Sequence, residues 1–140
     1  MPEFRISDSE CLYYEYTEPA SDNKHTFVFF NALTGDTAMW NDTVAKPLTD
    51  AGHGILVYNM RGQSNSEFVA GTALDQNLIV DDATKLLASI NPPSPIFVGL
   101  SIGGIFAAWT ALQGASCAGM VFINTPVSYT HLTLPTTPYV

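Results

Sequence analysis

The sequence is poor in basic residues and in cysteine, and each shortage excludes a class of protein. Five Lys and Arg stand against 13 Asp and Glu, which gives a formal net charge of −8 at pH 7. So little positive charge cannot line a groove that neutralises nucleic-acid phosphates, and it disfavours an anionic membrane surface. The two cysteines, Cys11 and Cys117, lie far apart and match neither a metal-ligand spacing nor a disulfide framework. We interpret both as small apolar side chains rather than as a bridge.

Long apolar runs and targeting signals are also missing. No stretch of about 18 apolar residues occurs, and residues 1–10 lack the basic segment and apolar core of a signal peptide. The sequence holds no glycine-rich phosphate loop, dinucleotide fingerprint or metal-ligand spacing, so we predict no cofactor and no metal. We expect a cytoplasmic protein that binds neither nucleic acid nor membrane. The oligomeric state stays open.

The chain has enough apolar residues for the core of one domain, since 46% of its 140 residues are hydrophobic. Apolar runs of strand type alternate with segments of helical spacing. Strands are predicted over residues 4–6, 12–16, 26–30, 55–58 and 120–123, and a further strand is predicted to begin at Pro95. Helices are predicted to begin after Asp36 or Thr37, to span residues 75–90, and to run from just after Ser101 to Gly114.

Alternation of this kind predicts an α/β fold, a mostly parallel sheet with helices on both faces. Pro47 should kink the first helix or end its first part. In the helix over 75–90, we expect Asp81 and Asp82 on a solvated face rather than in a metal site. Five aromatic residues are expected in the core: Phe27, Phe29, Phe30, Trp109 and Phe122. Trp109 shares one face of its predicted helix with Ile105, Ala108 and Leu112.

One stretch carries the chemistry. The strand from Pro95 meets Gly99-Leu100-Ser101-Ile102-Gly103, and a helical run follows at once. A serine between two glycines at a strand-to-helix turn is a nucleophile elbow. The turn holds the serine in a strained backbone conformation, and strand and helix pass so closely that side chains at Gly99 and Gly103 would collide.

With this elbow the chain resembles the α/β-hydrolase superfamily, of which it would hold the first six strands. Residues 27–35 resemble the strand and loop that carry the oxyanion hole. Residues 58–66, Tyr-Asn-Met-Arg-Gly-Gln-Ser-Asn-Ser, resemble the loop Asp-x-Arg-Gly-x-Gly-x-Ser. The chain departs from the family at Asn31-Ala32, where many members have His-Gly, and at Asn59 and Ser64, which replace Asp and Gly.

The resemblance implies a role for each matching residue. Ser101 would be the nucleophile, which argues against the epoxide hydrolase and dehalogenase branches because they use an aspartate there. The backbone N–H groups of Leu33 and Ile102 would form the oxyanion hole. Arg61 would brace loops beneath the site.

The residues that follow Pro126 differ from the rest of the chain. The segment 127–136, Val-Ser-Tyr-Thr-His-Leu-Thr-Leu-Pro-Thr, is rich in threonine and has no period. It resembles one reading frame of a transposase-type sequencing adapter, GTC TCT TAT ACA CAT CTG ACG CTG CCG ACG. We therefore predict an N-terminal part of the domain over 1–126 and a non-native tail over 127–140, with a genuine tail as the alternative.

This division leaves the nucleophile without a partner in the chain. In the family, the catalytic acid and histidine follow later strands. His131 falls in the adapter-like segment, and His25 and His53 are predicted at the opposite end of the sheet. Because a serine hydroxyl without a nearby imidazole is a poor nucleophile, we expect the fragment itself to be inactive.

Three functions stay open for the parent protein. The favoured one is a serine hydrolase that cleaves an ester, thioester, lactone or similar acyl bond of a small molecule. A non-catalytic binding protein on the same scaffold is the second, because fold alone does not establish activity. The third is an acyltransferase that passes the acyl group to an alcohol or amine.

Overall fold

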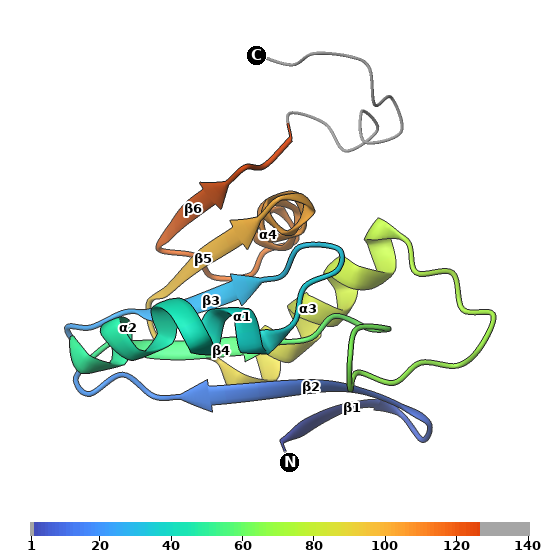
Figure 1. Cartoon of the computed structure of the whole chain (residues 1–140), viewed down its shortest axis with the longest axis horizontal. Helices are drawn as coiled ribbons and strands as arrows, with labels where there is room; N and C mark the ends of the chain where they lie inside the picture. The colour runs from blue at the N-terminus through green and yellow to red at the C-terminus, as the bar shows by residue number, and fades with distance from the viewer. Residues whose placement is uncertain (1, 127–140) are drawn as a thin grey trace.

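A computed structural model of the chain describes residues 2–126, so the predicted tail over 127–140 lies outside the described residues. These residues build one six-stranded sheet with the strand order β1-β2-β4-β3-β5-β6 (Figure 1). The strands are β1 (Glu3–Ser7), β2 (Glu10–Thr17), β3 (Thr26–Phe30), β4 (Gly54–Tyr58), β5 (Pro95–Leu100) and β6 (Gly119–Ile123). The adjacent strands β4, β3, β5 and β6 are parallel to one another, whereas β1 is antiparallel to β2 and β2 is antiparallel to β4.

Helices cover both faces of this sheet, which confirms the predicted fold class (Figure 1). One face carries α1 (Thr37–Trp40), η1 (Asn41–Ala45) and α2 (Lys46–Asp50), and the other carries α3 (Gln76–Ile90) and α4 (Ile102–Leu112). Within residues 2–126, no helix combines the length and the apolar character needed to cross a membrane.

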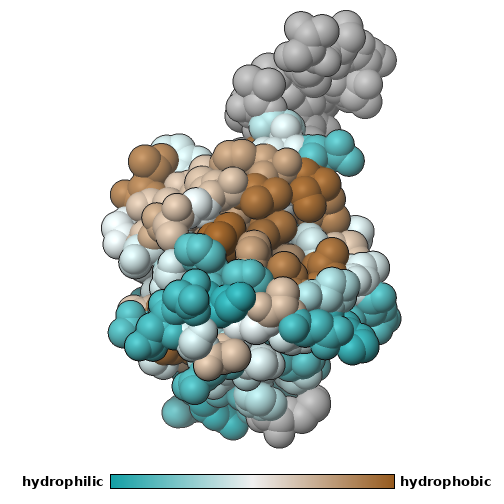
Figure 2. Space-filling view, turned by 90° about the vertical axis from the view of Figure 1, so that its left-hand side faces the viewer, coloured by the Kyte–Doolittle hydropathy of each residue, from teal (hydrophilic) through white to brown (hydrophobic). Residues whose placement is uncertain are grey.

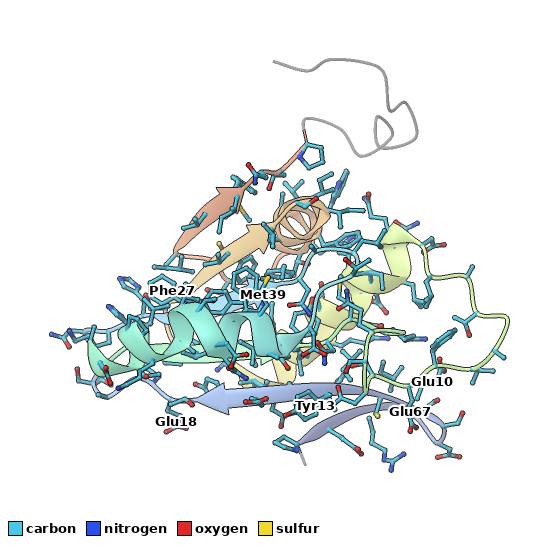
Figure 3. The ribbon with its side chains drawn as sticks, in the orientation of Figure 1. Glu10, Tyr13, Glu18, Phe27, Met39 and Glu67 are labelled. Carbon is cyan, nitrogen blue, oxygen red and sulfur yellow. The ribbon has the colours of Figure 1, made fainter. Side chains whose placement is uncertain are left out.

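The core forms two layers because successive strand residues point to opposite faces. In β3, Phe30 packs with Leu56 and Phe97 on the α3–α4 side, while Phe29 packs against Trp40 on the α1–α2 side. Phe27 and Met39 add partly buried apolar surface on the α1–α2 side, where Figure 3 labels them. The apolar run over 26–30 is thus a strand covered on both faces, as the sequence predicts.

The first helical segment begins at the expected residue and continues through Pro47. Asp36 caps α1, and its carboxylate accepts a hydrogen bond from the Ala38 N–H at 2.8 Å. Pro47 lies in the first turn of α2 and does not end the helix. A π-helical turn, η1, precedes it, because the wider turn accommodates a residue that cannot donate to the preceding carbonyl.

Two expectations about aromatic burial are wrong. Trp109 is 45% exposed and Phe122 is 51% exposed. The helix α4 buries the opposite side from the predicted one, through residues such as Gly103, Phe106 and Ala107. Because α4 is apolar nearly all round, its sequence does not show which side meets the sheet.

Candidate active site

The candidate site lies where three adjacent parallel strands end. In the order β4-β3-β5, the loop over 59–66 follows β4, the loop over 31–36 follows β3, and the elbow follows β5. Phe30 pairs with Gly99 and Phe29 with Val57, so the three strands end almost level. Open α/β sheets bind ligands beyond the carboxyl ends of their strands.

Ser101 occupies the single residue between β5 and α4. Its backbone has φ 55° and ψ −125°, a combination that costs a non-glycine residue strain. The Ser101 N–H donates to the Ile123 carbonyl at 2.8 Å, which ties the turn to the end of β6. The residue therefore lies in neither a regular strand nor a regular helix.

The two flanking glycines stand where no side chain fits. A Cβ on Gly99 would overlap the backbone of Gly104, and a Cβ on Gly103 would overlap the carbonyl oxygens of Phe30 and Asn31. The start of α4 is therefore packed against the end of β3 and its loop. This contact brings the Leu33 loop beside the elbow.

Both predicted oxyanion donors have an unused N–H group within the described residues. Neither the Leu33 N–H nor the Ile102 N–H donates to another described residue. Ile102 is the first residue of α4, where helix geometry leaves N–H groups without an intrahelical partner and favours negative charge. The Leu33 side chain is 69% exposed, so solvent reaches this loop.

The family departures at Asn31 and Asn59 contact each other in a buried network of amides. Asn31 Nδ2 lies 3.1 Å from Asn59 Oδ1 and 3.0 Å from the Tyr58 carbonyl. Trp40 Nε1 donates to Asn31 Oδ1 at 2.7 Å, and the Thr37 N–H donates to Asn59 Oδ1 at 3.0 Å. Each amide therefore has its polar atoms satisfied in place of the usual His and Asp.

Gln63 joins this network to the Leu33 loop, a function that the sequence analysis missed. Its Nε2 donates to the Ala32 carbonyl at 2.8 Å and to the Leu33 carbonyl at 3.0 Å. Its Oε1 accepts from the Met60 N–H and from Asn31 Nδ2, both at 3.0 Å. In the sequence, Gln63 is only a polar residue in a predicted loop. That this loop lies beside the Leu33 loop follows from the pairing of β3 with β4, which only the fold shows.

Arg61, which the sequence analysis expects to brace loops beneath the site, ties the loop over 59–66 to α3 and to the start of β2. Its guanidinium makes two hydrogen bonds to Asp82, at 2.6 and 2.9 Å, and one to Glu10 at 2.9 Å. Burial opposes its charge, but these carboxylates outweigh burial and raise the pKa of Arg61 above its ordinary value. Figure 3 labels Glu10, which lies at the start of β2 near Glu67.

The expectation of a solvated Asp82 is therefore wrong. The residue is 2% exposed and belongs to the buried ion pair, whereas Asp81 forms an exposed pair with Lys85. A carboxylate on an amphipathic helix faces solvent by default, and only the fold shows that Arg61 meets it.

Asp36 is the acidic residue closest in sequence to the predicted oxyanion loop. The Ala38 N–H, followed by the Ser64 hydroxyl, holds the pKa of the Asp36 carboxyl below its ordinary value. Its charge is thus committed to capping α1 and fixing the end of the loop.

The two described histidines, His25 and His53, do not reach this site. His25 precedes β3 and His53 precedes β4, so both lie at the amino-terminal ends of these strands, opposite the candidate site. There the His25 N–H donates to His53 Nδ1 at 3.1 Å. His131 lies outside the described residues. No group of three or more His, Cys, Asp or Glu side chains among residues 2–126 is placed to hold a metal ion.

Comparison with known proteins shows the family to which the chain belongs. The family model for the alpha/beta hydrolase fold matches residues 25–139. The chain belongs to the alpha/beta hydrolase family. A curated relative, 3-oxoadipate enol-lactonase 1 of Acinetobacter baylyi, is 32% identical over 95 residues, which are 68% of this chain and 34% of that protein.

Solved hydrolase structures share the fold. A structure from a study of carboxylesterases of the thaumarchaeon Nitrososphaera gargenis has a TM-score of 0.77 at 24% identity, over 89% of this chain and 46% of that chain. Proline iminopeptidase of Mycobacterium smegmatis has a TM-score of 0.76 at 18% identity, over 92% and 45% of the two chains. The chain thus spans about a third of its curated relative and just under half of these two structures.

Proposed function

We propose that the parent protein of this chain is a serine hydrolase that cleaves an ester, thioester or lactone bond of a small molecule. The observation that carries the proposal is the backbone of Ser101, with φ 55° and ψ −125° between a strand and a helix that leave no room for side chains at Gly99 and Gly103. Such strain persists where the surrounding structure enforces it, and it clusters at functional sites. The lactonase and carboxylesterase relatives support an acyl substrate.

In the proposed reaction, Ser101 Oγ attacks the acyl carbonyl carbon while a base takes its proton. The carbonyl oxygen becomes an oxyanion, which the N–H groups of Leu33 and Ile102 stabilise. Collapse of this intermediate breaks the acyl C–O or C–S bond, and the leaving oxygen or sulfur takes the proton from the base; in a lactone, the new hydroxyl stays attached to the acyl group. The base then takes a proton from a water molecule that attacks the acyl carbon. The bond to Ser101 Oγ breaks, Oγ takes that proton from the base, and the acid product leaves.

We propose that the base and its orienting acid come from a part of the parent protein beyond residue 126, because both described histidines lie at the amino-terminal ends of the strands, far from Ser101. The 140-residue chain by itself should then show no acylation burst, and a fast burst would contradict this view. The tail over 127–140 stays proposed as adapter read-through. Source codons that differ from the adapter over 127–136 would contradict that proposal.

The buried amides fit the enzyme despite the departures from the family pattern. Asn31 and Asn59 replace the family residues, yet they satisfy one another and their neighbours while leaving the Leu33 N–H unused. Buried polar groups are hydrogen-bonded in a binding protein as well, so the labelling experiment below, and not this network, separates the two functions.

A fluorophosphonate probe tests the proposal on the parent protein. We expect covalent labelling that peptide mass spectrometry maps to Ser101 and that Ser101→Ala abolishes. Absence of labelling in a folded parent protein would support the binding protein instead. Product analysis with an added alcohol or amine separates hydrolysis from acyl transfer.

A further inference from the structure

We propose that Gln63 is a positioning residue that turns the Leu33 N–H toward the elbow. The inference rests on the proposed function, since the N–H matters for catalysis only if an oxyanion forms at Ser101. Among the described residues, the Gln63 side chain makes no hydrogen bond to Ser101 or Ile102, and it acts through the peptide groups of the loop between β3 and α1.

The first step is geometric. The Ala32 carbonyl and the Leu33 N–H belong to one peptide group, and in a trans peptide these two bonds point in opposite directions. All peptide bonds among the described residues are trans. The Ala32 oxygen accepts from Gln63 Nε2 at 2.8 Å and from the Gly35 N–H at 2.9 Å, so the direction of the Leu33 N–H is fixed as well.

The second step is topological. β3 lies between β4 and β5, so its loop lies between the loop that carries Gln63 and the elbow that carries Ser101. Gln63 holds the carbonyl from the β4 side. The N–H of the same peptide group therefore points toward the β5 side, where Gly103 packs against the carbonyl of Asn31.

The third step concerns the orientation of the amide itself. The Met60 N–H can only donate and the Ala32 and Leu33 carbonyls can only accept, so Gln63 must present its oxygen to the first and its nitrogen to the others. A carboxylate at this position would face two carbonyl oxygens with no hydrogen to donate. Repulsion would then release the loop.

The test compares two amide-to-acid substitutions in the same network. Gln63→Glu removes both donors to the loop. Asn59→Asp keeps the oxygen that accepts from Thr37 and Asn31, and it loses only the bond to exposed Asn65, whose amide can turn to donate. The two variants therefore change charge equally but differ in their hold on Ala32 and Leu33.

The first measurement is NMR on the chain at pH 8 and pH 5, each variant being compared with the unsubstituted chain at the same pH. In Gln63→Glu at pH 8, we expect the Gly35 N–H to exchange about tenfold faster or more. The order parameters of Leu33 and Thr34 should fall from about 0.85 to below about 0.6. The two carbonyl oxygens that face the new carboxylate raise its pKa, so at pH 5 a larger share of it is protonated and can donate one hydrogen bond. Exchange should then slow toward the unsubstituted rate, and Asn59→Asp should stay close to that rate throughout.

Unchanged exchange in Gln63→Glu, or equal acceleration in both variants, would overturn the proposal. Gln63→Met serves as a second variant, because it removes the donors without repulsion and should loosen the loop with no recovery at pH 5. If both Gln63 variants also lost exchange protection in β3 and β5, Gln63 would be a general structural residue and the proposal would fail.

Kinetics on the parent protein give the functional arm. Gln63→Glu should lower kcat by about a hundredfold with little change in KM, because an oxyanion donor acts mainly in the transition state. The ratio of its kcat to that of the unsubstituted parent at the same pH should rise toward low pH, although protonation of the base lowers both values. If the probe does not label Ser101 in the unsubstituted parent, the proposed function fails. The NMR comparison still decides whether Gln63 holds the loop.

Discussion

At the scale of single residues, the site depends on groups that are absent as much as on groups that are present. Gly103 lies against the carbonyl oxygens of Phe30 and Asn31, which are backbone atoms that cannot rotate away. Gly119, at the start of β6, has only Ile96 near its missing Cβ, at 4.0 Å. The two glycines therefore differ in the room they have, although both flank the elbow strand.

We predict that Gly103→Ala lowers the free energy of unfolding by about 3 kcal/mol or more, at or above the upper end of the usual cost of overpacking. Gly119→Ala should change it by less than about 1 kcal/mol and can stabilise, because alanine restricts the unfolded chain. Urea unfolding of both variants, followed by circular dichroism, measures the difference. Equal values would show that α4 does not pack on the β3 loop as described.

At the scale of elements, a single carboxylate begins the first helical segment. The Ala38 N–H and then the Ser64 hydroxyl lower the pKa of Asp36, so the folded state favours its charged form. Its contribution to stability is therefore complete above the ordinary carboxyl pKa and is lost as the pH falls through the lower pKa of the folded state.

We predict that Asp36→Ala costs about 1 kcal/mol of stability at pH 7, the usual value for a lost N-cap, and less at pH 3. Asp36→Asn keeps a capping oxygen without a titrating group, so it should retain most of the stability at pH 7 and remove this part of the pH dependence. Urea unfolding at the two pH values checks both variants. An identical pH dependence in Asp36→Asn and the unsubstituted chain would contradict the assignment.

The helix α3 places two neighbouring acids in opposite surroundings. Asp82 is paired with the buried Arg61, and Asp81 is paired with Lys85, where both side chains are more than half exposed. Removing one partner of a buried pair leaves a charge without compensation, whereas exposed pairs contribute little.

We therefore predict that Asp82→Asn lowers the free energy of unfolding by about 3 kcal/mol, while Asp81→Asn changes it by less than about 0.5 kcal/mol. Thermal and urea unfolding of the two variants provide the comparison. A small effect of Asp82→Asn would mean that the remaining ion pair with Glu10 compensates the Arg61 charge or that water reaches it.

The sequence predicted the elements far better than their contacts. The strand bounds agree within one or two residues, because runs such as 26–30 and 55–58 are apolar on both faces and end at turn formers. Periodicity placed Trp109 in the core and Asp82 in solvent, and both are wrong, because burial depends on which side of a helix meets the sheet. Gln63 was missed because its partners follow β3, and the sequence does not show that β3 pairs with β4, the strand before Gln63.

At the scale of the whole molecule, β6 is one of the two edge strands of the sheet that the described residues form, and β1 is the other. Among these residues β6 pairs only with β5, and apolar surface flanks it on both faces. On the α1–α2 side, a groove of about 320 Å³ is lined by residues that include Trp40, Leu48 and Val121. Figure 2, which views the molecule from the left-hand side of Figure 1, shows hydrophobic surface in its upper part above a hydrophilic region. On the α4 side, Trp109 and Phe122 line a second groove.

An unpaired strand with exposed apolar side chains is a template for pairing with another chain. We predict that the 140-residue chain self-associates through β6, and more strongly at high salt, where the net charge of −8 is screened. Phe122→Lys places a charge on the exposed side chain and should raise the monomer fraction in analytical ultracentrifugation. Ser116→Lys, an exposed change of equal charge in the loop before β6, should leave association nearly unchanged. An equal response to both lysines would mean that net charge, and not the edge of β6, controls association.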